Sequence, residues 1–369
     1  MYLLPKPKTI KEQDGQMLLC HSTHIVMTKE VAETEMHAAK RLQEAIRQET
    51  GLILPFSVGE VREGDLSLGI AKTLPEQTYE ITIDEKGGQI SGGDGAGVLY
   101  GVETFCQIVQ QCGGILPCVQ IQDAPDMPNR GYYFDQTRGR VLKLEELKKI
   151  ADRMCRYKLN QLQLYVEHTY LFRDFSEMWR DQTPLTAEEI RELDSYCRER
   201  HIELVPSLAS FGHLCTLLST KTYGDLCEME DSWKEPFSFW NRMRYHTINV
   251  SDERSLPLIK KMIAEYMQLF SSNKFNICAD ETFCLGKYKS KKLAEERGVH
   301  RLYIDYVKEL AQFLVENGKI PMFWGDIIWN SPELMKELPE SMICLNWGYA
   351  PEQREDETRA IAQTGAVQY

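Results

Sequence analysis

The sequence lacks several features that would assign a class of protein at once. No run of about 18 apolar residues occurs in the 369 residues, so we expect no membrane-spanning helix. Basic residues are not in excess either, since 43 Lys and Arg stand against 55 Asp and Glu, a formal net charge of −12. Nucleic acids and anionic membranes bind basic surfaces, so we expect neither as a partner.

Paired cysteines and a leader segment are also missing. The eleven cysteines, from Cys20 to Cys344, form no CxxC pair and have no zinc-like spacing with histidines. We expect reduced thiols, as in a cytosolic protein, and neither a metal ion nor a cofactor. The first eight residues contain no charged segment followed by an apolar one, which predicts no secretory signal and a cytoplasmic location.

Residues 1–125 predict a small N-terminal α/β domain. A strand at 23–27 is followed by a long amphipathic helix at 29–48, which Gly51 is placed to end. The glycines at 92–95 lack the spacing of a phosphate-binding loop or a Rossmann turn, so we interpret them as turn and cap residues. Three further strands and a second helix are expected at 66–70, 79–83, 89–91 and 96–111.

Residues 126–369 predict a second domain of another kind. The segment Asp123–Pro128 is rich in Pro and Asp and marks the boundary. Beyond it strands and helices alternate, which indicates a parallel sheet covered by helices and, from the number of units, a (β/α)8 barrel of the TIM type. Residues 247–250 are interpreted as part of a loop. The strands are expected at 131–135, 161–166, 202–208, 275–278, 320–324 and 342–347, and the helices at 144–157, 186–200, 255–271, 301–317, 332–337 and 351–363.

The number of strands falls short of a closed barrel. Residues 366–369 look like the opening of a seventh strand, and the sequence stops there. A barrel without its last two units would expose sheet edges and core. We therefore expect the chain to be a fragment, truncated near strand seven, of a longer protein.

Two adjacent carboxylates, Asp280 and Glu281, follow the apolar strand expected at 275–278. An Asp-Glu pair is common on protein surfaces and at helix N-termini. This pair is different because the carboxyl ends of barrel strands are where catalytic groups gather. Sugar hydrolysis also requires two carboxyl groups of different character, one protonated and one ionised.

Other expected strand ends carry polar or aromatic side chains as well. A single Arg, His or Trp at such a place is usually a surface or core residue. Six consecutive strand ends of this kind are hard to attribute to chance, and aromatic walls with converging polar groups are typical of a sugar pocket. The residues concerned are Arg138, Glu167, His168, His213, Asp280, Glu281, Trp324, Asp326 and Trp347.

Several segments resemble the family 20 β-N-acetylhexosaminidases. The segment 116–138 looks like the family's opening barrel strand and the approach to it, and 97–104 is similar to the last helix of its α/β domain. Phe211–His213 corresponds to the family's Pro-Gly-His segment, and Ala279–Glu281 to its catalytic Asp-Glu pair. The resemblance covers nearly the whole chain.

The resemblance implies hydrolysis of terminal N-acetylhexosamines with the substrate's own acetamide as nucleophile and net retention. Glu281 would be the general acid and Asp280 would polarise the acetamide N–H. His213 would orient Glu281, and Glu167 would orient His213. The remaining roles are binding ones: Arg138 would hold the sugar hydroxyls, Trp324 and Trp347 would line the acetamide pocket, and Asp326 would be a further sugar contact.

Two departures from the family pattern leave alternatives open. Glu167-His168 stands where the family usually has Asp-Asp, which suggests a divergent bacterial branch, and the pocket residues of strands seven and eight are absent. One alternative is therefore a catalytically silent sugar-binding protein or an inert fragment. Another is a conventional retaining glycosidase with Asp326 as protein nucleophile. The sequence does not decide between GlcNAc and GalNAc, and it leaves the oligomeric state unknown.

Overall fold

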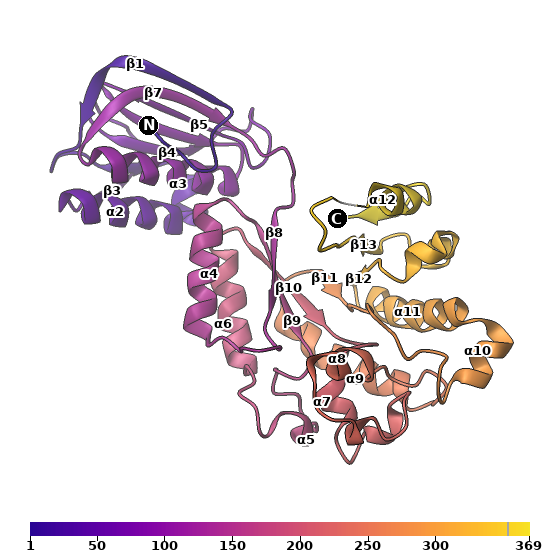
Figure 1. Ribbon diagram of the computed structural model, residues 1–369. Helices are drawn as coiled ribbons and strands as arrows, with labels where there is room; N and C mark the ends of the chain where they lie inside the picture. Colours follow the sequence, from indigo (N-terminus) through magenta and orange to yellow (C-terminus); the bar gives the residue numbers. More distant parts are fainter. Residues whose placement is uncertain (353) are drawn as a thin grey trace. The chain divides into compact units, whose positions relative to one another are not determined.

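The computed structural model describes residues 1–352 and 354–369, which divide into two compact units (Figure 1). The first unit contains residues 1–132, 145–161 and 195–203, and the second contains 133–144, 162–194 and 204–369. No helix in the described part of the chain combines the length and the apolar character needed to cross a membrane.

The first unit is built on a mixed sheet of seven strands in the order β1-β7-β5-β6-β4-β2-β3. The helix α3 (Gly95–Cys112) packs against this sheet, and every residue from Ala96 to Val109 is buried. The strands are β1 (Thr9–Leu18), β2 (Ile25–Met27), β3 (Phe56–Val58), β4 (Leu66–Ile70), β5 (Tyr79–Asp84), β6 (Gly87–Gly92) and β7 (Ile115–Asp123).

Several features of this unit differ from the sequence-based expectation. The helix expected at 29–48 is divided into α1 (Lys29–Thr34) and α2 (Met36–Thr50), because buried Glu35 leaves the helical conformation and its carboxylate contacts His201 at 2.8 Å. The strands β3 and β7 were not expected. Neither was β1, since most of its residues are exposed and its apolar residues do not alternate. It forms because it pairs in antiparallel register with β7.

The second unit contains a curled sheet of seven strands in the order β14-β13-β12-β11-β10-β9-β8 (Figure 1). The registers from β10 through β14 are parallel, which confirms the barrel-type fold as an open half-barrel over the described residues. The strands are β8 (Gly131–Asp135), β9 (Gln161–Val166), β10 (Glu203–Leu208), β11 (Lys274–Asn276), β12 (Ile320–Trp324), β13 (Ile343–Leu345) and β14 (Val367–Gln368).

The helices agree with the alternating pattern, with local differences. The segment expected as a helix at 332–337 is a 3-10 helix, and the helix expected from 351 begins at Glu355. Short helices between β10 and α9 were not expected. The helices are α4 (Leu144–Arg156), α5 (Ser176–Trp179), α6 (Ala187–Arg198), α7 (Cys215–Leu218), α8 (Phe239–Arg244), α9 (Ser255–Tyr266), α10 (Lys291–Arg297), α11 (Val299–Glu316) and α12 (Glu355–Ala362), and the 3-10 helices are η1 (Gly224–Leu226), η2 (Ser232–Lys234), η3 (Met267–Leu269), η4 (Ile328–Asn330) and η5 (Pro332–Glu337).

Apolar side chains from neighbouring strands of the half-barrel pack together. Val205, Met322, Ile343 and Leu345 form one buried cluster, against which Trp324 packs. Because these strands run parallel, their carboxyl ends lie at a common edge of the sheet. The candidate functional residues follow those ends.

Candidate active site

The chain after β11 makes a strained turn that carries the two adjacent carboxylates. Cys278, Ala279 and Glu281 all have left-handed backbone conformations, with φ values of 58°, 64° and 49°. His213, after β10, is a fourth such residue, with φ of 60°. Each non-glycine residue of this kind costs about 1–3 kcal/mol, and such residues cluster where a fold must hold a functional group in place.

Three hydrogen bonds from different elements hold this turn. The Asn276 side-chain oxygen accepts from the Cys278 N–H at 2.8 Å, and the Tyr303 hydroxyl donates to the Ala279 carbonyl at 3.0 Å. Asp326 Oδ2 accepts from the Glu281 N–H at 3.0 Å. The backbone of Asp280 and Glu281 is therefore fixed by β11, α11 and the segment after β12.

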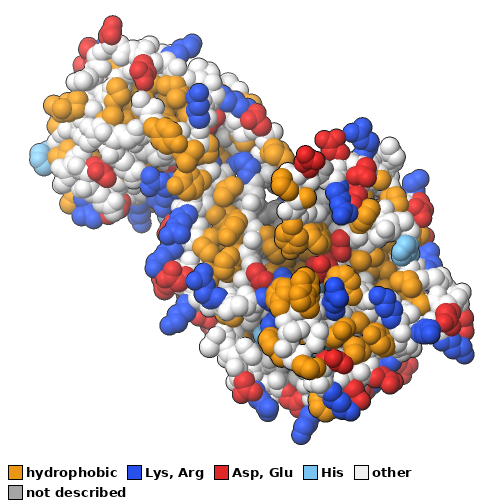
Figure 2. Space-filling model, viewed as in Figure 1, with side chains coloured by type: hydrophobic (Ala, Val, Ile, Leu, Met, Phe, Trp, Pro, Cys, Tyr) orange, Lys and Arg blue, Asp and Glu red, His pale blue; other side chains and the backbone are white. Residues whose placement is uncertain are grey.

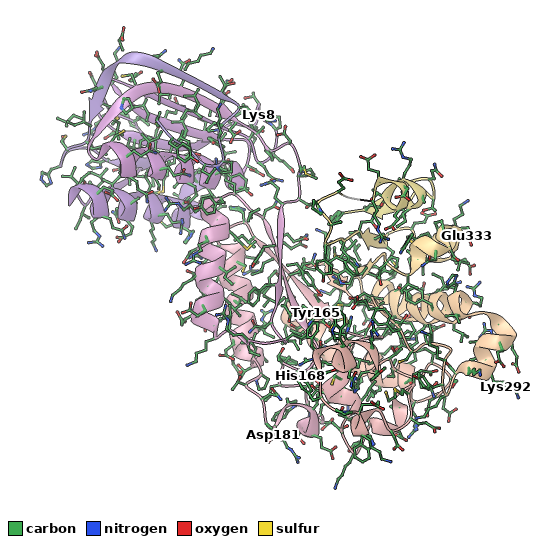
Figure 3. The ribbon with its side chains drawn as sticks, viewed as in Figure 1. Lys8, Tyr165, His168, Asp181, Lys292 and Glu333 are labelled. Carbon is green, nitrogen blue, oxygen red and sulfur yellow. The ribbon has the colours of Figure 1, made fainter. Side chains whose placement is uncertain are left out.

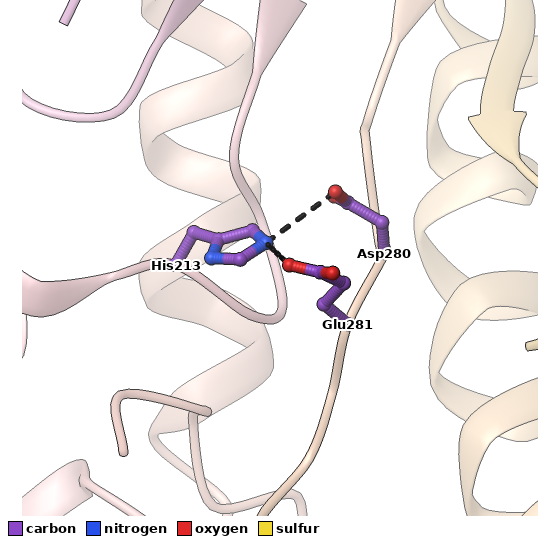
Figure 4. A group of neighbouring side chains, drawn as sticks. All are labelled: His213, Asp280 and Glu281. Carbon is purple, nitrogen blue, oxygen red and sulfur yellow. Dashed lines mark ion pairs between the residues drawn. The ribbon is translucent and has the colours of Figure 1, made fainter. Parts of the chain in front are cut away.

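One ring nitrogen of His213 faces both carboxylates, as Figure 4 shows. Its Nε2 is 3.2 Å from Glu281 Oε2 and 3.4 Å from Asp280 Oδ2. The residue is only 3% exposed, and neither ring nitrogen makes a hydrogen bond of good geometry with the described residues, so the contact is electrostatic. The expected proximity of His213 to Glu281 is present.

The charge of His213 follows from its surroundings. Burial favours the neutral ring and lowers its pKa, but the carboxylates of Asp280 and Glu281 outweigh burial and raise the pKa of His213 to about 10. The ring is therefore a buried cation at neutral pH. These three residues are also close enough together to hold a metal ion, although an ion would have to displace a proton from His213, since only the neutral imidazole is a ligand.

Glu167 does not pair with His213. Its carboxylate accepts a hydrogen bond from the Tyr165 hydroxyl at 3.0 Å and one from Arg242 Nη2 at 3.0 Å. No hydrogen bond or ion pair joins Glu167 to His213 among the described residues. The negative charge of Glu167 still contributes to raising the pKa of His213. Sequence reasoning missed Arg242 because it lies on α8, a short helix whose pattern carries no signal. Tyr165 and His168, labelled in Figure 3, mark the carboxyl end of β9.

Arg138 is held by the strand end from which it comes. Its Nε lies 2.7 Å from Asp135 Oδ2, and its guanidinium carbon is 4.6 Å from the centre of the Tyr165 ring. Its Nη1 contacts the sulfur of Met243 at 3.2 Å. Burial lowers the pKa of Arg138, but Tyr165, Asp135 and Glu167 outweigh it and raise the pKa, so the side chain remains a cation.

A cavity of about 380 Å³ lies beside Glu281. Asp326 and Trp347 are part of its lining, and Asp326 Oδ1 and Trp347 Nε1 are buried without a hydrogen-bond partner among the described residues. Burial, followed by the charge of Asp280, raises the pKa of Asp326 to about 7. Asp326 thus presents one oxygen to the Glu281 backbone, and titrates near neutral pH.

Trp324 is not among the residues lining this cavity. Its ring instead packs edge-on against Tyr133, with 5.0 Å between the centroids, and against the apolar cluster of the half-barrel. Trp324, the last residue of β12, and Tyr133, on β8, are both half-buried. The structure therefore brings Trp347 to the cavity beside Glu281 and Asp326, and packs Trp324 against Tyr133 and the apolar cluster.

Comparisons with known proteins agree with this arrangement. A family model described as "Glycosyl hydrolase family 20, domain 2" matches residues 1–124, and one described as "Glycosyl hydrolase family 20, catalytic domain" matches residues 128–367. The second match alone covers well over half of the chain.

Individual relatives are distant but extensive. A beta-hexosaminidase of Porphyromonas gingivalis is 24% identical over 88% of this chain and 45% of its own length, and one of Vibrio furnissii is 26% identical over 76% and 48%. The chain thus spans about half the length of these curated relatives. The solved exo-β-N-acetylglucosaminidase of Vibrio harveyi, in complex with N-acetylglucosamine, has a TM-score of 0.81 and 19% identity over 99% of this chain and 60% of that one. At this identity the likeness supports the fold.

Proposed function

Because the chain belongs to glycosyl hydrolase family 20, we propose that it acts as an exo-β-N-acetylhexosaminidase on terminal, non-reducing β-linked GlcNAc or GalNAc. The observation that carries the proposal is the contact of buried His213 with both Asp280 and Glu281 at the strand ends. A pair of neighbouring carboxylates beside one cation supports proton transfer and acetamide activation in a single site.

The proposed mechanism uses the substrate as its own nucleophile. Glu281, at the cavity, donates its proton to the glycosidic oxygen while the acetamide carbonyl oxygen attacks the anomeric carbon and the glycosidic bond breaks. Asp280 takes the hydrogen bond of the acetamide N–H and stabilises the positive charge of the resulting oxazolinium. Glu281, now ionised, takes a proton from a water molecule, whose oxygen attacks the anomeric carbon. This attack opens the oxazolinium ring and gives the product with retained configuration.

The surrounding residues position these groups. The ring of His213 contacts and orients both carboxylates, and Asp326 holds the Glu281 backbone. In this proposal Arg138 and Glu167 bind hydroxyls of the terminal sugar, and Trp347 lines the acetamide pocket with Trp324 behind it. No step requires a metal ion or a cofactor.

We extend the proposal to the organisation of the chain. Residues 1–125 would be the N-terminal α/β domain and residues 126–369 the catalytic barrel domain, which the limits of the two family matches support. All eleven cysteines are free thiols, which supports a cytoplasmic location. Fractionation of the source cells, with the protein traced by antibody, would test the location.

The function is tested with Asp280→Asn and a thiazoline that mimics the oxazoline intermediate. Because Asp280 acts mainly in the transition state, we expect kcat to fall about 10²–10³-fold with a smaller change in KM. The thiazoline should bind the wild type far more tightly than free N-acetylglucosamine. Equal binding of the two compounds would exclude substrate assistance and favour a protein nucleophile.

A further inference from the structure

The helix α8 (Phe239–Arg244) contacts the proposed site from outside the sheet, yet the mechanism above does not use it. Arg242 donates to Glu167 at 3.0 Å, and the sulfur of Met243 contacts Arg138 at 3.2 Å. The Arg244 carbonyl accepts from the Cys284 thiol at 3.0 Å, three residues after Glu281. The helix is therefore attached both to the sugar-binding pair and to the segment that follows the general acid.

Two large aromatic side chains of this helix are exposed, and so is that of Phe237, two residues ahead of it. Trp240 is 65% exposed, Phe239 58% and Phe237 82%. The rings of Phe239 and Trp240 lie edge to face, 5.8 Å apart, and Arg244 lies 5.5 Å from the centre of the Trp240 ring. In Figure 2 hydrophobic side chains gather on the surface where Figure 1 shows α8. Contiguous exposed apolar surface of this kind marks a binding site.

Helical geometry relates these rings to the site. Residues three or four apart lie on the same face of a helix. Phe239 therefore shares a face with Arg242 and Met243, and Trp240 shares one with Met243 and Arg244. The exposed rings continue, by one turn, the face of α8 that meets Glu167 and Arg138.

We infer that α8 forms a subsite for the sugar on the leaving-group side of the scissile bond, with Trp240 and Phe239 as the stacking surface. An exo-acting site holds the terminal sugar, so the rest of the glycan must lie on the side of the general acid, where the Cys284–Arg244 hydrogen bond places α8. The apolar face of a pyranose ring packs on an aromatic ring, and the Arg244 guanidinium beside it can donate to ring hydroxyls. The inference rests on the proposed function.

The test compares Trp240→Ala with the wild type on two substrates. One is the β1,4-linked disaccharide of N-acetylglucosamine, and the other is the β-azide of N-acetylglucosamine, whose leaving group has no ring. We expect kcat/KM on the disaccharide to fall about five- to tenfold, with little change on the azide, since a stacking contact is worth about 1 kcal/mol. Trp240→Phe should recover most of the loss. Trp233→Ala, which removes a ring that is 60% exposed outside α8, is the matched control and should change neither substrate.

The outcomes separate this inference from the proposed function. If the wild type turns over the azide and Trp240→Ala keeps the wild-type kcat/KM on the disaccharide, the subsite is overturned and the proposed function stands. Equal losses on both substrates overturn it too, because they show that α8 only supports Arg138 and Glu167. A change of Trp240→Ala in sedimentation, without a change in disaccharide kinetics, assigns the rings to self-association instead. If the wild type turns over neither substrate, the proposed function fails, and calorimetry tests the subsite by itself. The subsite is supported if the wild type binds the disaccharide more tightly than N-acetylglucosamine and Trp240→Ala loses this difference. Equal binding of the two sugars by the wild type overturns the subsite.

Discussion

The side chains of Asp280 and Glu281 are neighbours in the chain, but their surroundings divide the work between them. Glu281 lines the cavity and has its backbone held by Asp326, while both carboxylates share the buried cation His213. A general acid matters most when the leaving oxygen is basic, whereas an acetamide activator matters for every leaving group. This difference gives each residue its own kinetic signature.

At the residue scale, Glu281→Gln is expected to lower kcat/KM by about 10²–10⁴-fold on substrates with sugar or alkyl leaving groups. The loss on activated aryl glycosides should be much smaller, because their leaving oxygens depart without protonation. Parallel steady-state assays of both substrate types on the wild type and the variant measure the effect. Losses of the same size on both types would contradict the role of Glu281 as the acid.

The raised pKa of His213 predicts a pH dependence of stability. The ordinary histidine value is 6.5 and the folded value is about 10, so the folded state binds the extra proton in that interval. The stabilisation is fully present below about pH 6.5 and is lost as the pH rises through about 10, at up to about 1.4 kcal/mol for each pH unit between the two values. Chemical denaturation of the wild type and His213→Gln should show the difference in their free energies of unfolding shrinking over this interval. A difference that is constant with pH would show that the pKa of His213 is not raised by folding.

At the scale of elements, the strained turn after β11 depends on a close approach by the segment after β10. A Cβ added at Gly212 would lie 2.6 Å from the carbonyl oxygen of Asp280. No side chain can be accommodated there without moving the backbone that carries the two carboxylates. Residue 212 must therefore be glycine for Asp280 and Glu281 to lie where they do.

Gly212→Ala is therefore expected to lower the free energy of unfolding by about 1–3 kcal/mol and to lower kcat by about 10²-fold. Thermal denaturation and assays at saturating substrate measure the two effects. Gly114→Ala is the matched control, because its added Cβ has no neighbour nearer than 3.6 Å. A Gly212→Ala variant with normal kcat would show that the turn tolerates displacement.

At the scale of the whole molecule, each of the two compact units contains buried apolar side chains. Domains with their own cores unfold in separate steps unless they are strongly coupled. All six tryptophans belong to the second unit, so tryptophan emission reports on that unit alone, while far-ultraviolet circular dichroism reports on both. The tryptophans are Trp179, Trp233, Trp240, Trp324, Trp329 and Trp347.

We expect Leu42→Ala, in the core of the first unit, to destabilise that unit by about 2–5 kcal/mol and to shift only part of the circular dichroism transition. The tryptophan transition in urea should stay where it is in the wild type. Leu310→Ala, an equally buried leucine of the second unit, should shift the tryptophan transition instead. If Leu42→Ala moved both transitions together, the two units would unfold as one.

The sequence by itself determined the sheet of the second unit and the residues that end its strands. Apolar runs such as 161–166 and 320–324 are buried strands, and the Asp280–Glu281 pair does follow β11. These features depend on local patterns of apolar and polar residues, which are readable along the chain. The contact of His213 with Glu281 was predicted from the resemblance to a family, and the structure contains it.

Only the tertiary structure decided which partner each of these side chains has. Glu167 pairs with Arg242 rather than with His213, Trp324 packs on Tyr133, and Glu35 interrupts a regular helical pattern to meet His201. Each of these contacts joins residues more than 70 positions apart. The first also depends on α8, whose six residues carry no periodic signal. A side chain's partner is set by which elements pack together, and the pattern within one element does not encode that.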